Sequence, residues 1–135
     1  MAFIDARGIP ADQTSVDRLA ANGLDYRLVD FQDDAQAASY QRAVARGFLG
    51  GEPTAASLAA ERATFAERRN TGVYDRAGSV DALPVATINS WVTPLTVPGG
   101  DEVAMWAISV VTVAGTHRRR GIARALLEGE LRAAN

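Results

Sequence analysis

The feature that most constrains the fold is a strand-like run that leads directly into an arginine-rich turn and then a helix. Residues 103–113, VAMWAISVVTV, are rich in β-branched side chains, which favours a long strand buried on both faces. The turn THRRRG follows, and from Arg120 or Gly121 apolar residues recur at helical spacing to the end of the chain. This order of strand, turn and helix indicates an α/β chain.

The middle of the chain predicts two helices. The first begins after an N-cap at Asp33 or Asp34 and ends at the glycine pair 50–51. The second begins after Thr54 and ends at 70–72, with Leu58, Ala59 and Phe65 toward the core.

Strands are predicted on both sides of these helices. Alternating polarity predicts one at 24–31, and a hairpin joins strands at 73–75 and 83–97, the latter broken late by Pro94. Residues 1–22 are expected to form a poorly structured lead-in in which Ser15 caps a short helix.

Composition excludes several classes of protein. The chain has 135 residues, enough for one domain, and carries a net charge of −2, which does not favour nucleic acid or an anionic membrane. It has no cysteine and one histidine, so we expect no metal site. No apolar stretch is long enough to span a membrane, and the N-terminus lacks a signal-peptide pattern, so we expect a cytoplasmic protein.

The positive charge is concentrated at the last helix. From His117 onward there are five arginines and two glutamates, a local balance of +3 in an otherwise acidic chain. The first amides of a helix lack intrahelical partners, and the helix dipole adds positive potential there, which suits phosphate. Gly121 lets an oxygen approach the backbone, and guanidiniums from 118–120 and Arg124 add charged hydrogen bonds. We therefore predict a diphosphate site.

Two other phosphate loops fit less well. A Walker loop needs a lysine followed by serine or threonine, and neither is present here. Arg119 and Arg124 occupy the positions where a dinucleotide fingerprint has glycine.

Arg118, Gly121 and Ala123 form an Arg-x-x-Gly-x-Ala pattern between a strand and an amphipathic helix. This pattern resembles the coenzyme A pyrophosphate loop of GNAT-superfamily N-acetyltransferases. The stretch from about 84 to 134, extended back to about 24, resembles the acetyltransferase domain of Eis-like (enhanced intracellular survival) proteins. The resemblance implies a mixed, mostly antiparallel sheet flanked by helices, with residues 23–135 forming an incomplete GNAT domain.

The resemblance also implies roles. Acetyl-CoA would be the acetyl donor, its pantetheine arm would pair with the backbone at 111 and 113, and the Val111 N–H would hold the thioester oxyanion. The acceptor would be a small-molecule or lysine-type primary amine, and the parent protein would be an oligomer. The expected cofactor-binding residues are Val111, Thr112, Val113, Arg118, Arg119, Arg120, Gly121, Ile122, Ala123 and Arg124.

The sequence departs from the family pattern at two points. Gly115 stands where the turn usually has proline. The tyrosine acid and the C-terminal carboxylate base of Eis-like proteins map onto no residue of this chain, so the catalytic residues are unassigned and the chain alone is expected to be inactive. A non-catalytic module that binds coenzyme A or a nucleotide is the alternative. A nucleic-acid-binding arginine turn is disfavoured, because aromatic residues are not interleaved with the arginines.

Overall fold

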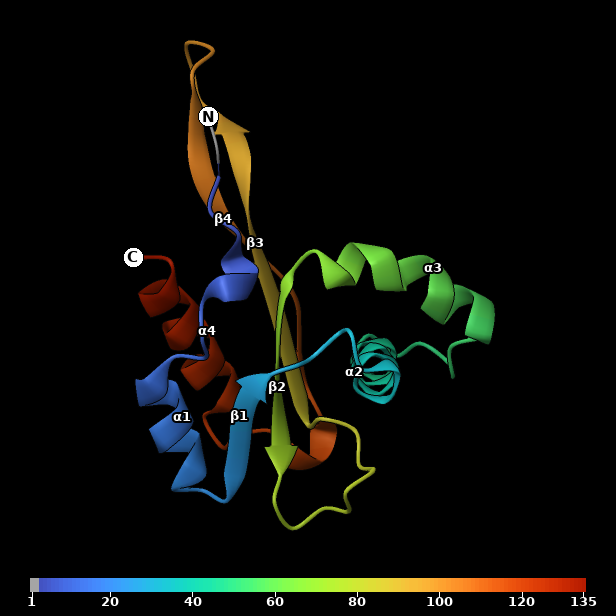
Figure 1. The fold of residues 1–135 in the computed structure, drawn as a ribbon. Coiled ribbons are helices and arrows are strands. Elements are labelled where there is room, and N and C mark those ends of the chain that lie inside the picture. The colour runs from blue at the N-terminus through green and yellow to red at the C-terminus, as the bar shows by residue number, and fades with distance from the viewer. Residues whose placement is uncertain (1–2) are drawn as a thin grey trace.

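The computed structural model describes residues 3–135 and contains one four-stranded antiparallel sheet (Figure 1). The strand order follows the chain, and the helices flank the sheet, so the predicted mixed α/β class is confirmed. The strands are β1 (Leu24–Leu28), β2 (Arg69–Asp75), β3 (Ala86–Thr96) and β4 (Glu102–Val113). The helices are η1 (Ala6–Gly8), α1 (Gln13–Ala20), α2 (Asp34–Gly47), α3 (Ala55–Ala66), η2 (Gly115–His117) and α4 (Ile122–Ala133).

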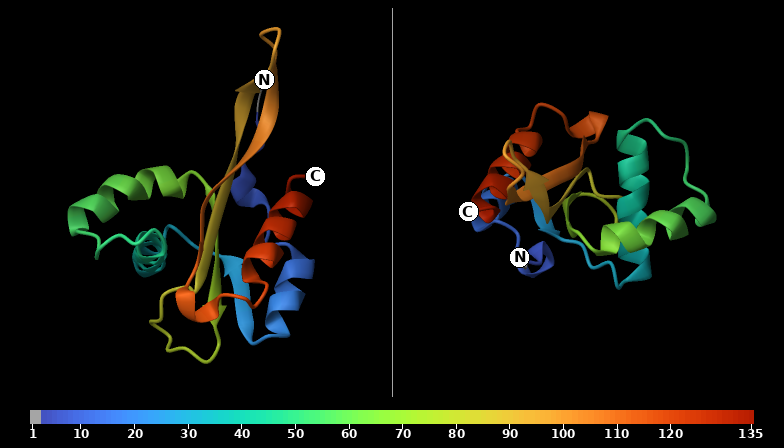
Figure 2. Two further views of the ribbon diagram at one scale, coloured as in Figure 1. Left: turned by 180° about the vertical axis from the view of Figure 1, so that it is seen from behind. Right: turned by 90° about the horizontal axis from the view of Figure 1, so that it is seen from above.

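The sheet separates two apolar clusters. Helices α1 and α4 lie on one face and α2 and α3 on the other, as the view from above shows (Figure 2). The first cluster joins Leu19, Ile88 and Leu126, with other buried residues of α1, α4 and the strands. The second is largely aromatic, with Phe31, Tyr40 and Phe65 in edge or tilted contacts. The helix that follows the arginine turn therefore has a fixed face against the sheet.

The segment predicted to be a poorly structured lead-in is ordered where the structure describes it. Helix α1 is capped by Asp12 rather than Ser15, because the Asp12 carboxylate accepts the Ser15 N–H at 3.0 Å. The buried Ser15 hydroxyl instead donates to the Ala125 carbonyl of α4 at 2.6 Å. Leu19 is buried against the sheet, and this apolar contact orders the segment. Residues 1–2 of the predicted lead-in lie outside the described residues.

Strand β2 begins four residues earlier than predicted, at Arg69 instead of 73. The Asn70 side chain donates to the carbonyls of Phe65 and Arg68, at 2.7 and 3.0 Å, and so satisfies the end of α3. Residues 69–72 are mostly polar, so their sequence did not predict a buried strand. They are buried nevertheless, because their polar groups are paired within the protein.

Two further boundaries differ from the predictions. Helix α2 ends at Gly47 rather than at the glycine pair 50–51, and Leu49 just beyond it has a φ of 60°. Strand β3 continues through Pro94, which pairs with Ala104 of β4. Strand β2 begins at Arg69, which pairs with Ser90, so β3 has no β2 partner at Pro94, where proline is tolerated.

The prediction that β4 is buried on both faces is wrong. Strand β4 is the edge of the described sheet, and most of its residues are exposed or half-buried. Its outer half forms, with β3, a hairpin that projects beyond the other strands (Figure 1). The β-branched composition reflects strand propensity here, not burial on two faces.

A buried ion pair ties the sheet to α4. The fully buried Arg69 guanidinium donates to Glu130 at 2.6 Å and to the carbonyls of Ile9 and Pro10 at 3.0 and 2.8 Å. The Trp106 indole N–H donates to the other Glu130 oxygen at 2.8 Å. The Glu130 carboxylate thus joins β2, β4 and α4, and the Arg69 guanidinium adds the N-terminal segment.

Removing this carboxylate should be costly. Glu130→Ala leaves the Arg69 charge buried without its partner, so we expect a loss of about 3–5 kcal/mol in the free energy of unfolding. Urea unfolding followed by far-UV circular dichroism measures it. The control is Arg7→Ala, which breaks the exposed Arg7–Asp5 pair. A Glu130→Ala midpoint as close to the parent as that of Arg7→Ala would contradict the assigned role.

Candidate functional site

The turn between β4 and α4 is shaped by two residues in the left-handed region. Arg119 has a φ of 65°, and Gly121, the N-cap of α4, has a φ of 73°. A side chain is disfavoured at that φ, which explains the glycine, and a Cβ at Gly121 would meet nothing within 4 Å. The N-cap backbone therefore opens to solvent.

The first amides of α4 are free. The Ala125 N–H donates to the Gly121 carbonyl at 3.1 Å, which is the first bond of the helix. Within residues 3–135, neither a backbone group nor a capping side chain accepts a bond from the amides of Ile122, Ala123 and Arg124. Three N–H groups at the positive end of the helix dipole suit an anion.

Three arginines surround these amides. Arg118, Arg119 and Arg120 are exposed, and no carboxylate of the described residues lies within ion-pair distance of them. A small cavity of about 170 Å³ opens at this point. It is lined by Val113, His117, Arg118, Arg119, Gly121, Ile122, Ala123 and Arg124. The residues predicted from the loop pattern are therefore brought together, except Arg120, which does not line the cavity.

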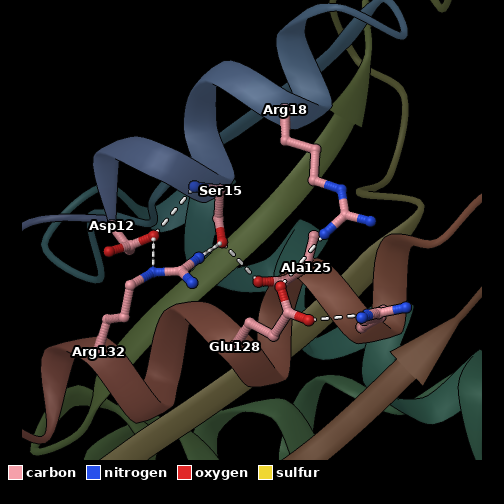
Figure 3. A network of polar contacts seen from close by, with 7 residues as sticks. Asp12, Ser15, Arg18, Ala125, Glu128 and Arg132 are labelled. Atoms are coloured by element: carbon pink, nitrogen blue, oxygen red, sulfur yellow. Dashed lines mark hydrogen bonds and ion pairs between the residues drawn. The ribbon is translucent and has the colours of Figure 1, made fainter.

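Arg124 differs from the other three arginines. Its Nε donates to the Glu128 carboxylate one turn further along α4, at 2.7 Å. This hydrogen bond raises the pKa of Arg124 and is the largest cause of the lowered pKa of Glu128. Glu128 also accepts from Arg18 of α1 at 3.2 Å (Figure 3). The i,i+4 spacing of 124 and 128 is the sequence signal for this pair.

His117 anchors the turn to the sheet. Its Nε2 lies 2.7 Å from the Asp75 carboxylate at the end of β2, and its Nδ1 lies 2.7 Å from the Thr116 hydroxyl. The bond to His117 is the main cause of the lowered pKa of Asp75. No sequence pattern pairs these residues, because 42 positions separate them.

A bulge interrupts β4 just before the turn. Asn89 pairs with Ser109 and Thr87 with Thr112, so β4 has one residue more than β3 between these pairs. Val110 has a φ of 49°, which is strained for a β-branched residue.

Threonines hold the bulge in place. The Thr87 hydroxyl donates to the Val110 carbonyl at 2.7 Å and lies 2.7 Å from the Thr112 hydroxyl. Helix α2 packs closely here, since a Cβ on Gly47 would overlap the Thr112 side chain. The Val111 side chain is 37% exposed on this edge strand, in contrast to the predicted burial of the strand on both faces. Val113 packs against the first apolar cluster as expected.

A larger cavity of about 470 Å³ lies between the end of α2 and this end of β4. It is lined by Ala43, Arg46, Gly47, Leu49, Thr112, Val113, Ala114, Gly115, Thr116 and Arg118. It shares Val113 and Arg118 with the small cavity at the free amides. A long ligand that lies along the end of β4 can thus reach the start of α4.

The described residues contain no group of three potential metal ligands among histidine, cysteine, aspartate and glutamate. No helix in the described range combines the length and apolar character that a membrane span needs. Aromatic and acidic side chains near the connection between α2 and α3 could in principle bind a cationic amine. They do not form one pocket there, because Phe48 is exposed, Phe65 is buried and Glu52 pairs with Arg42.

Comparison with known proteins places the chain in one family. Residues 28–135 match the acetyltransferase (GNAT) domain family, so this chain belongs to it. An uncharacterized N-acetyltransferase of Streptomyces griseus is 40% identical over 100 residues, which are 74% of this chain and 23% of that protein. The chain thus spans about a quarter of the length of the curated relatives it matches.

Solved structures agree with this assignment. Eis1 from Mycobacterium abscessus is similar with a TM-score of 0.60 and 25% identity, covering 81% of this chain and 24% of that one. A GCN5-related N-acetyltransferase from Kribbella flavida is similar with a TM-score of 0.59 and 29% identity, covering 84% and 28%.

Proposed function

We propose that this chain provides the acetyl-CoA-binding part of an Eis-like N-acetyltransferase that transfers acetyl to a primary amine. The observation that carries the proposal is the set of three free amides at the start of α4, next to three unpaired guanidiniums and the edge of β4. Membership of the GNAT family and the similarity to Eis1 support it.

Each part of the ligand has a matching part of the site. The diphosphate would accept hydrogen bonds from the amides of 122–124 and from the arginines at 118–120. The pantetheine arm would lie beside Val111, Thr112 and Val113, where the edge of β4 has no further strand in the described sheet. Arg118 lines both cavities and would contact the junction of these two parts.

The reaction would take place beside the bulge. The amine nitrogen would attack the thioester carbonyl, and the Val111 N–H would donate to the oxyanion of the tetrahedral intermediate. Collapse of this intermediate would re-form the carbonyl and break the carbon–sulfur bond, so that the nitrogen loses a proton and the coenzyme A thiolate gains one. The side chains of Thr87, Ser109 and Thr112 around the bulge are neutral hydroxyls, which are poor general bases. We infer that none of these three side chains is the general base and that the chain alone is inactive.

The remaining assignments follow from the Eis-like resemblance. The acceptor would be a small-molecule or lysine-type amine, and copies would assemble into a homo-oligomer. A cytoplasmic location stays an expectation from the sequence and does not rest on this resemblance. A non-catalytic coenzyme A-binding module is the second candidate, favoured by the neutral side chains at the bulge. Because this chain alone is expected to be inactive, the assay needs a protein of the relatives' length that contains it. Release of free thiol from acetyl-CoA and a primary amine by such a protein would support the enzyme, and coenzyme A binding without thiol release would support the module.

Removing the unpaired guanidiniums should weaken binding. In Arg119→Ala with Arg120→Ala, each lost charged hydrogen bond should cost about 1.5–3 kcal/mol of coenzyme A binding free energy. Isothermal titration calorimetry measures the change. Arg62→Ala is the matched control, because it removes an arginine of α3 that pairs with Asp34. An unchanged affinity in the double variant would exclude these arginines from the site.

A side chain at the N-cap should abolish binding. Gly121→Val places a branched side chain where the phosphate would approach the amides, so we expect no measurable coenzyme A binding in the same titration. Gly99→Val is the matched control, since Gly99 has a φ of 101° and open space around it but lies in the β3–β4 turn. Normal binding by Gly121→Val would show that the loop is assigned incorrectly.

A further inference from the structure

One acidic side chain lies beside the arginine cluster. Glu128 projects from α4 between two guanidiniums, Arg124 from its own helix and Arg18 from α1. The two carboxylate oxygens are divided between them, at 2.7 Å to Arg124 and 3.2 Å to Arg18. Figure 3 shows Arg18 and Glu128 facing each other where α1 crosses α4.

Arg124 lines the small cavity at the free amides, but its Nε is tied to Glu128 in the next turn of α4. Helical side chains incline toward the N-terminus of their helix, which would carry the Arg124 guanidinium toward the start of α4. The bond to Glu128 instead draws it toward the next turn. Arg124 is the one predicted phosphate-binding arginine whose guanidinium is held by a carboxylate in the described residues.

We propose that Glu128 lowers the affinity of the site for a diphosphate, because its ion pair with Arg124 must break before Arg124 can bind a phosphate. Arg18 shares the same carboxylate, so it weakens that ion pair and makes its exchange for a phosphate less costly. This inference rests on the proposed coenzyme A function. When the diphosphate arrives, Arg124 exchanges Glu128 for a phosphate oxygen, and Glu128 keeps Arg18 as its partner. Glu128 and Arg18 are thus positioning residues that set affinity without touching the ligand.

The exchange is energetically accessible. The Arg124 side chain is 73% exposed and that of Glu128 33%, so their ion pair is well hydrated and weak. Diphosphate carries more charge than one carboxylate, and it binds guanidiniums through short charge-assisted bonds. The Glu128 carboxylate is ionised at neutral pH, as any ordinary glutamate is, so both arginines stay attracted to it. Its lowered pKa reflects that attraction, to which the hydrogen bond from Arg124 contributes most.

The two partners of Arg124 should shift binding in opposite directions. Glu128→Gln frees Arg124, so the coenzyme A Kd should fall about two- to threefold, the size expected for an i,i+4 ion pair. Arg18→Gln leaves Glu128 to hold Arg124 alone, so the Kd should rise about twofold. Calorimetric titration measures both, and thermal unfolding checks that each variant is folded.

A double-variant cycle separates this role from general electrostatics. In an Arg124→Gln background, neither Glu128→Gln nor Arg18→Gln should change the Kd. A persisting effect would mean that the charges act on the ligand at a distance, and it would overturn the proposal. Glu128→Asp is a second variant that keeps the charge but shortens the reach to Arg124. It should lower the Kd, and a Kd equal to that of the parent would also overturn the proposal.

The choice of ligand separates this inference from the proposed function. Pantetheine lacks the diphosphate, so its binding should be the same in the parent, Glu128→Gln and Arg18→Gln. A parent protein that binds no coenzyme A would reject the proposed function itself. A parent that binds coenzyme A, with a Glu128→Gln Kd that is unchanged or higher, would reject only the role of Glu128.

Discussion

The buried ion pair between Arg69 and Glu130 is the interaction on which the arrangement of the site depends. It joins β2 to α4, and the Trp106 indole extends the same contact to β4. Burial of two charges is stabilising only when their hydrogen bonds are satisfied, and the Ile9 and Pro10 carbonyls complete that set. The pair therefore fixes the direction in which α4 presents its first amides.

The rest of the site follows from that direction. With α4 held on one face of the sheet, Gly121 turns the chain through the left-handed region and leaves three amides without partners. Just before this turn, the bulge in β4 is held by the hydrogen bond from the Thr87 hydroxyl to the Val110 carbonyl. His117 connects the turn to Asp75 at the end of β2. The free backbone groups of α4 and the free edge of β4 thus lie next to each other, as a long ligand with a diphosphate at one end requires.

Local patterns in the sequence predicted the fold class, which the structure confirms, and the diphosphate loop, which stays a prediction. Both depend on neighbouring residues. The β-branched run, the arginines and Gly121 lie within about twenty positions and carry their meaning in spacing alone. The long-range contacts were not predictable in this way. The burial of Arg69 depends on Glu130, and the order of α1 depends on Ser15 meeting Ala125 across the fold. The burial of β4 was predicted incorrectly, because composition does not reveal whether a strand is central or at an edge.

The central claim is that the unpaired amides at the start of α4 hold a diphosphate. A ¹⁵N-edited NMR titration with coenzyme A observes these amides directly. The account predicts that the largest shifts fall on Ile122, Ala123 and Arg124, that Gly121 follows, and that pantetheine leaves these signals in place. Saturable binding of coenzyme A without movement of these signals, or equal shifts with pantetheine, would contradict it.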